Sequence, residues 1–84
     1  MIVDVYSKDG CGYCVAATNL LRQRGIKFNE QKLDAHFTRE MIKEQFPFAK
    51  TFPIIVVDGM HIGGYNELTE ELKKRDSGQI LLSE

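Results

Sequence analysis

The chain contains little cysteine: Cys11 and Cys14 are the only two cysteines in its 84 residues. A structural disulfide between them would close a loop too short to constrain the unfolded chain, so stability must come from packing. A structural zinc site needs four ligands, and a second C-x-x-C motif is absent. The two histidines, His36 and His61, do not have the spacing of a zinc finger or ribbon. We therefore expect no metal site of this kind.

The chain also lacks an excess of either charge. Eleven basic and twelve acidic residues give a net charge of −1, so there is no electrostatic footprint for nucleic acid or for an anionic membrane. No stretch approaches membrane-spanning length, and the N-terminal sequence MIVDVYSKDG lacks the basic start and apolar run of a signal peptide. We expect the protein to be cytoplasmic. In the cytoplasm, disulfides are usually transient and catalytic.

Linkers, repeats and low-complexity segments are absent too, and the length allows one small domain spanning residues 1–84. Alternation of β-branched and aromatic residues predicts strands at 2–6 and 26–33. The stretch at 53–64 predicts a hairpin that turns at Asp58-Gly59. These patterns supply four strands.

Helical spacing predicts three helices between and after these strands. The first spans Gly12 to Arg24 and stops at Gly25. The second is capped by Thr38 and ends at Pro47, and the third is capped by Asn66. The residues expected to face inward are Cys14, Ala17, Thr18 and Leu21 in the first helix and Leu68 and Leu72 in the third. An apolar tail, Ile80 to Leu82, is expected to pack back on the core. The resulting order is β-α-β-α-β-β-α, an α/β fold with a parallel pair and a terminal antiparallel hairpin.

The first cysteine lies where this plan ends a strand and begins a helix. The free N–H groups and partial positive charge of a helix N-terminus stabilise a thiolate at Cys11. Cys14 lies one turn further into the helix, gains less from this effect and is expected to be buried. This arrangement favours a redox pair over a metal site, with Cys11 as the attacking thiol and Cys14 as the resolving thiol. Lys8 adds positive potential nearby.

Two further motifs accompany the cysteines. Pro53 begins a predicted strand after Phe52, where proline is tolerated in a sheet. A cis proline there would present the backbone of Phe52 to an extended peptide. In the stretch HIGGYNEL, the paired glycines allow positive φ or a close backbone approach. The helix start at Tyr65 and Asn66 offers N–H groups suited to a carboxylate.

Together, Cys11-Gly12-Tyr13-Cys14, Thr51-Phe52-Pro53 and Gly63-Gly64-Tyr65-Asn66 resemble the glutaredoxin family of the thioredoxin fold, in its short bacterial or phage form. The resemblance covers nearly the whole chain. It implies a four-stranded mixed sheet flanked by helices. It also implies a glutathione-dependent thiol–disulfide oxidoreductase that reduces protein disulfides and glutathionylated thiols.

Roles for individual residues follow from the same resemblance. Cys11 and Cys14 would form the redox-active disulfide. The glutathione-binding residues would be Lys8, Tyr13, Thr51, Phe52, Pro53, Gly64, Tyr65 and Asn66. The expected partners are glutathione, as co-substrate, and disulfide-containing proteins, ribonucleotide reductase among them, with the protein acting as a monomer.

Two positions depart from the family pattern. Gly12 stands where the common dithiol motif has proline, and Asn66 stands where aspartate is common. Glycine at position 12 is shared by family members that bind clusters. An iron–sulfur carrier, with Cys11 and glutathione from two protomers holding the cluster, is therefore one alternative. A redoxin reduced directly by thioredoxin reductase is another, although the segment from Gly63 to Asn66 argues against it.

Overall fold

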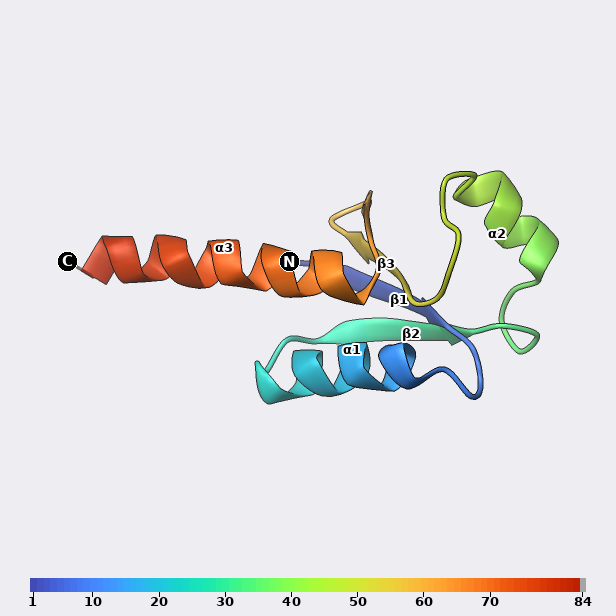
Figure 1. Cartoon of the computed structure of the whole chain (residues 1–84), viewed down its shortest axis with the longest axis horizontal. Coiled ribbons are helices and arrows are strands. Elements are labelled where there is room, and N and C mark those ends of the chain that lie inside the picture. The colour runs from blue at the N-terminus through green and yellow to red at the C-terminus, as the bar shows by residue number, and fades with distance from the viewer. Residues whose placement is uncertain (84) are drawn as a thin grey trace.

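Four strands form one mixed sheet in the computed structural model, which describes the backbone of residues 1–83 and the side chains of residues 1–74 (Figure 1). The strands are β1 (Val3–Ser7), β2 (Phe28–Lys32), β3 (Ile54–Val57) and β4 (Met60–Gly63). Their order across the sheet is β2-β1-β3-β4. β1 pairs in parallel with β2, whereas β1 with β3 and β3 with β4 are antiparallel pairs.

Within residues 1–83, three helices connect and follow the strands. They are α1 (Gly12–Gln23), α2 (Arg39–Gln45) and α3 (Tyr65–Ser83). The predicted order β-α-β-α-β-β-α is confirmed. In Figure 1, α2 lies at the opposite end of the molecule from the end toward which α3 extends. No helix within the described residues is long and apolar enough to cross a membrane.

Among the side chains that the structure describes, the sheet separates two hydrophobic clusters, because successive strand residues face opposite sides. Val5 of β1 belongs to the larger cluster, and its neighbour Tyr6 packs against the smaller one. The buried residues of the larger cluster come from the sheet, α1 and α3: Val3, Val5, Ala17, Leu21, Ile55, Val57, Leu68 and Leu72. Those of the smaller cluster are Phe37, Ile42 and Ile54, with Ile42 supplied by α2.

Helix α1 places the cysteines as the sequence predicts. Its buried face is Cys14, Ala17, Thr18 and Leu21. Cys11 is the N-cap, with an extended backbone (φ −103°, ψ 106°), so the strand-to-helix transition falls at this residue. At the other end, Gly25 adopts φ 68°, the left-handed conformation that commonly follows a helix C-terminus.

The hairpin is also confirmed, with Asp58 at φ 51° and Gly59 at φ 84° between β3 and β4. Two positive φ angles in a two-residue turn match the twist of antiparallel strands. The predicted cap of α2 is confirmed as well, because the Thr38 hydroxyl accepts a hydrogen bond from the Met41 N–H at 3.2 Å.

The predicted cap of the last helix is wrong. α3 begins at Tyr65, so Asn66 lies inside the first turn, and Gly64 precedes the helix. The carbonyl of Gly64 accepts from the Leu68 N–H at 3.0 Å, while its N–H donates to Glu67 Oε1 at 2.7 Å. A glutamate three residues after the cap that accepts from the cap's N–H is half of a capping box, and it fixes the helix start. The side chains of the predicted apolar tail, Ile80 to Leu82, lie outside the described residues.

Candidate active site

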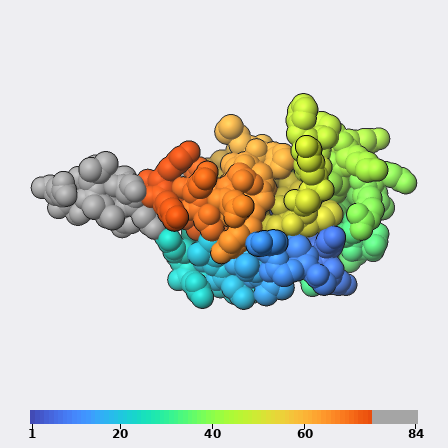
Figure 2. All heavy atoms as spheres, in the orientation of Figure 1, coloured from blue at the N-terminus to red at the C-terminus, as the bar shows by residue number. Residues whose placement is uncertain are grey.

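The sulfur of Cys11 lies between two chain segments that are far apart in the sequence. It accepts a hydrogen bond from the Cys14 N–H at 3.2 Å, and its thiol donates to the carbonyl oxygen of Phe52 at 3.7 Å. In Figure 2, the blue N-terminal part of the chain lies against the yellow part. The N–H contact is the interaction that a helix start offers to a thiolate.

The second cysteine is in a different environment. Cys14 is 3% exposed, whereas Cys11 is half-buried, and both are free thiols. Burial, and next the hydrogen bond with Cys11, raise the pKa of the Cys14 thiol to about 12. A backbone hydrogen bond from Lys8 opposes this shift. At neutral pH Cys14 is therefore a protonated thiol beside the sulfur of Cys11.

A groove of about 220 Å³ brings together seven of the eight predicted glutathione-binding residues. Tyr13 comes from the first turn of α1, and its ring centroid lies 5.8 Å from that of Tyr65 at the start of α3. The groove is lined by Tyr13, Thr51, Phe52, Pro53, Gly64, Tyr65, Asn66 and Glu67. The Phe52–Pro53 peptide bond is cis, as hypothesised from the sequence.

Lys8 is the predicted residue that does not line this groove. It lines a neighbouring hollow together with both cysteines, and its Nζ lies 5.8 Å from the centroid of the Phe52 ring. Conversely, Glu67 lines the groove and was not among the predicted residues. Its position three residues after Gly64, typical of a capping box, is the sequence signal that indicates its contact with the Gly64 N–H.

The paired glycines meet both conditions that the sequence suggested. Gly63 has φ 128°, a conformation that other residues rarely adopt. A Cβ on Gly64 would lie 3.3 Å from the carbonyl oxygen of Pro53, so the absence of a side chain lets α3 start close to the loop before β3. Gly12 differs: a Cβ there would meet nothing within 4 Å, so packing does not require glycine between the cysteines.

Comparison with known proteins shows where this arrangement belongs. The family model described as Glutaredoxin matches residues 3–62. The chain belongs to the glutaredoxin family. It is 38% identical over 68 residues to Glutaredoxin 3 of Escherichia coli (strain K12), a match that covers 79% of this chain and 80% of that protein.

Solved glutaredoxin structures have the same fold. Glutaredoxin 1 from Francisella tularensis, crystallised with cacodylate, aligns with a TM-score of 0.77 and 29% identity over 90% of this chain and 96% of that one. A buckwheat glutaredoxin–glutathione complex aligns with a TM-score of 0.73 and 32% identity over 89% of this chain and 69% of that one. The fold is therefore thioredoxin-like, and family membership supports a thiol–disulfide oxidoreductase role.

Within the described residues, no group of three or more histidine, cysteine or acidic side chains is placed to hold a metal ion. What the site can do chemically follows from its two thiols. A thiolate at Cys11 attacks a disulfide sulfur and forms a mixed disulfide, and the leaving sulfur departs with the electron pair and takes up a proton. Cys14, one helical turn away, can then attack Cys11 Sγ and release the second half of the substrate.

Proposed function

We propose that this glutaredoxin is a glutathione-dependent enzyme that reduces protein disulfides and glutathionylated thiols. The observation that carries the proposal is the groove beside Cys11. The groove is lined by Tyr13, Thr51, Phe52 and Pro53, and it ends at the start of α3. At Phe52 the backbone is available to pair with an extended peptide. The Phe52 carbonyl is 3.7 Å from the reactive sulfur, so a cysteinyl residue paired with Phe52 would have its own sulfur next to Cys11.

Glutathione is a short, extended peptide with a carboxylate at each end, and it matches the groove in these respects. The first N–H groups of α3, from Tyr65 and Asn66, suit the γ-glutamyl carboxylate. Lys8, beside the cysteines, suits the glycyl carboxylate or the thiolate. The structure of a buckwheat relative as a complex with glutathione supports the same ligand for this chain.

The physiological setting is part of the proposal. Reduced glutathione and thiols kept reduced are features of the cytoplasm, so we place the protein there, acting as a monomer in a single domain of residues 1–84. Its protein clients would be disulfide-containing enzymes, with ribonucleotide reductase as one candidate acceptor of electrons.

Two variants test the proposal with a glutathionylated peptide, glutathione, and glutathione reductase with NADPH as the recycling system. Cys11→Ser should abolish turnover because it removes the attacking thiol. Cys14→Ser should retain turnover because a second glutathione can release the mixed disulfide at Cys11. Loss of activity in Cys14→Ser would exclude glutathione as the partner. If thioredoxin reductase with NADPH supports turnover when glutathione is left out, the result would favour direct reduction by thioredoxin reductase.

The iron–sulfur alternative stays a prediction drawn from the family resemblance. Cys11 is the more accessible of the two thiols, since Cys14 is 3% exposed. A cluster would therefore be held by Cys11 and glutathione from each of two protomers. The function of the protein would then be cluster transfer. Visible absorbance of protein purified without oxygen, together with its mass in solution, tests this role. A colourless monomer would exclude it.

A further inference from the structure

The resolving step poses a proton-transfer problem. Cys14 must lose its proton to attack, yet it is 3% exposed and burial raises the pKa of its thiol to about 12. The thiolate is the nucleophile in disulfide exchange. Resolution therefore requires a group near Cys14 that receives this proton.

A hollow of about 430 Å³ opens beside both cysteines, separate from the groove that Tyr13 lines. Cys14, Cys11, Ser7 and Glu30 are among the residues lining it. Since a water molecule in the liquid takes up about 30 Å³, the hollow has room for several. Cys14 and Glu30 therefore line the same hollow.

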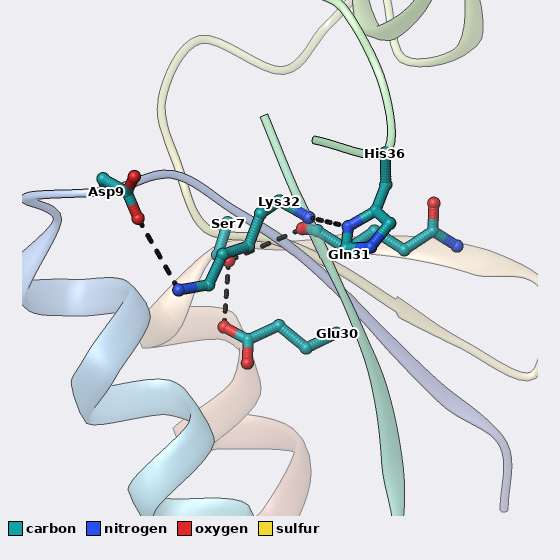
Figure 3. Close-up of polar contacts among 6 residues, drawn as sticks. All are labelled: Ser7, Asp9, Glu30, Gln31, Lys32 and His36. Atoms are coloured by element: carbon teal, nitrogen blue, oxygen red, sulfur yellow. Dashed lines mark hydrogen bonds and ion pairs between the residues drawn. The ribbon is translucent and has the colours of Figure 1, made fainter. Parts of the chain in front are cut away.

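The register of β2 against β1 decides on which side of the sheet Glu30 lies. Glu30 pairs in register with Val5, so it lies on the same side of the sheet as Val5 and Ser7, the side that α1 covers. The hydroxyl of Ser7, 1% exposed, donates to Glu30 Oε2 at 2.9 Å and also lies 3.5 Å from the carbonyl oxygen of Gln31. Figure 3 shows the Glu30 carboxylate held by this contact. A carboxylate can accept several hydrogen bonds, so the bond from Ser7 fixes the position of the Glu30 carboxylate and leaves it able to accept others.

The other polar side chains around the hollow make contacts of their own. The hydroxyl of Thr18 donates to the carbonyls of Cys14 and Val15. Lys32 Nζ lies 3.6 Å from Asp9 Oδ1 (Figure 3). The side chain of Lys32 is 50% exposed and that of Asp9 is 94% exposed, so this ion pair lies at the surface. Lys8 also lines the hollow: its backbone hydrogen-bonds Cys14, while its Nζ lies near the Phe52 ring.

We propose that Glu30 accepts the proton of Cys14, through water in this hollow, as Cys14 attacks the mixed disulfide at Cys11. The inference rests on the roles proposed above for the two cysteines. In this step the S–H bond of Cys14 breaks and its proton passes to the Glu30 carboxylate. The Cys14 sulfur forms a bond to Cys11 Sγ while the bond from Cys11 to the substrate sulfur breaks. The cysteine pair is oxidised to a disulfide, and the substrate leaves as a thiolate that takes a proton from water.

The test follows one turnover of the reduced protein with one equivalent of 5,5′-dithiobis(2-nitrobenzoate), in the absence of glutathione. Attack by Cys11 releases one coloured thiolate, and resolution by Cys14 releases the second. Glu30→Gln keeps an acceptor for the Ser7 hydroxyl but cannot take up the proton. We expect it to slow the second phase, relative to the first, by roughly a hundredfold, a common contribution of a general base.

Three comparisons make the result decisive. Glu44→Gln, at an exposed position of α2, should leave the ratio of the two phases unchanged. Glu30→Asp keeps a carboxylate and should resolve faster than Glu30→Gln. If Glu30→Gln leaves the ratio of the two phases unchanged, the proposal is overturned. Equal slowing of both phases would also overturn it, because it would show that Glu30 has a structural role. Because no glutathione is present, the outcome is independent of whether glutathione is the physiological reductant.

Discussion

The thiol of Cys11 lies 3.7 Å from the carbonyl oxygen of Phe52, a residue 41 positions away in the chain. The contact joins the start of α1 to the loop before β3, and it places the reactive sulfur at the edge of the groove that Phe52 lines. The N–H of Cys14 approaches the same sulfur at 3.2 Å. Cys11 is thus held by backbone groups on two sides.

This difference between the two thiols predicts their reactivity. At pH 7, iodoacetamide should alkylate Cys11 in the Cys14→Ser variant at least roughly a hundredfold faster than it alkylates Cys14 in the Cys11→Ser variant. Cys14 is buried and its pKa is raised to about 12, and each unit by which a pKa exceeds the pH lowers the thiolate fraction about tenfold. Mass spectrometry over time measures both rates. In denaturant the two rates should converge, and a faster Cys14 in the native protein would reverse the assigned roles.

The raised pKa of Cys14 also predicts a loss of stability in alkali. The native thiol holds its proton to about pH 12, while the unfolded thiol, with a pKa of 9.0, loses it earlier. The stabilising contribution is therefore complete below about pH 9 and is lost as the pH rises toward 12, with a slope of about 1.4 kcal/mol per pH unit. Urea unfolding of the reduced protein at pH 8 to 11, compared with Cys14→Ala, isolates this slope. Parallel stability curves for the two proteins would contradict the prediction.

The glycines offer a matched pair of substitutions. Gly63→Ala should lower the free energy of unfolding by at least about 1 kcal/mol, because Gly63 has φ 128° and its Cβ would lie 2.5 Å from Glu67 Cγ. Gly12→Ala should change stability by no more than about 0.5 kcal/mol, because its Cβ meets nothing within 4 Å. Denaturant titration measures both. A Gly12→Ala variant as unstable as Gly63→Ala would mean that the space around Gly12 is not open.

Local patterns in the sequence were sufficient for most of the fold. Strand alternation, the Asp58-Gly59 turn and the Thr38 cap are short-range signals, and each is confirmed. The start of the last helix was misplaced because Gly64 and Asn66, which lie two residues apart, can both precede a helix. Asn66 has the stronger capping side chain, but the Glu67 contact with the Gly64 N–H places the cap at Gly64, two residues earlier in the chain.

The features of the candidate site also fall into those that the sequence predicts and those that depend on the tertiary structure. The sequence by itself determined that Cys11 caps a helix and that Cys14 is buried one turn later, because helical periodicity links residues three and four apart. Only the tertiary structure decided that Glu30 shares a hollow with Cys14, since that requires the register of β2 against β1 and the packing of α1 on one side of the sheet. Strand pairing joins residues more than twenty positions apart through backbone hydrogen bonds, which carry no side-chain signature, so no local pattern around Glu30 could have revealed it.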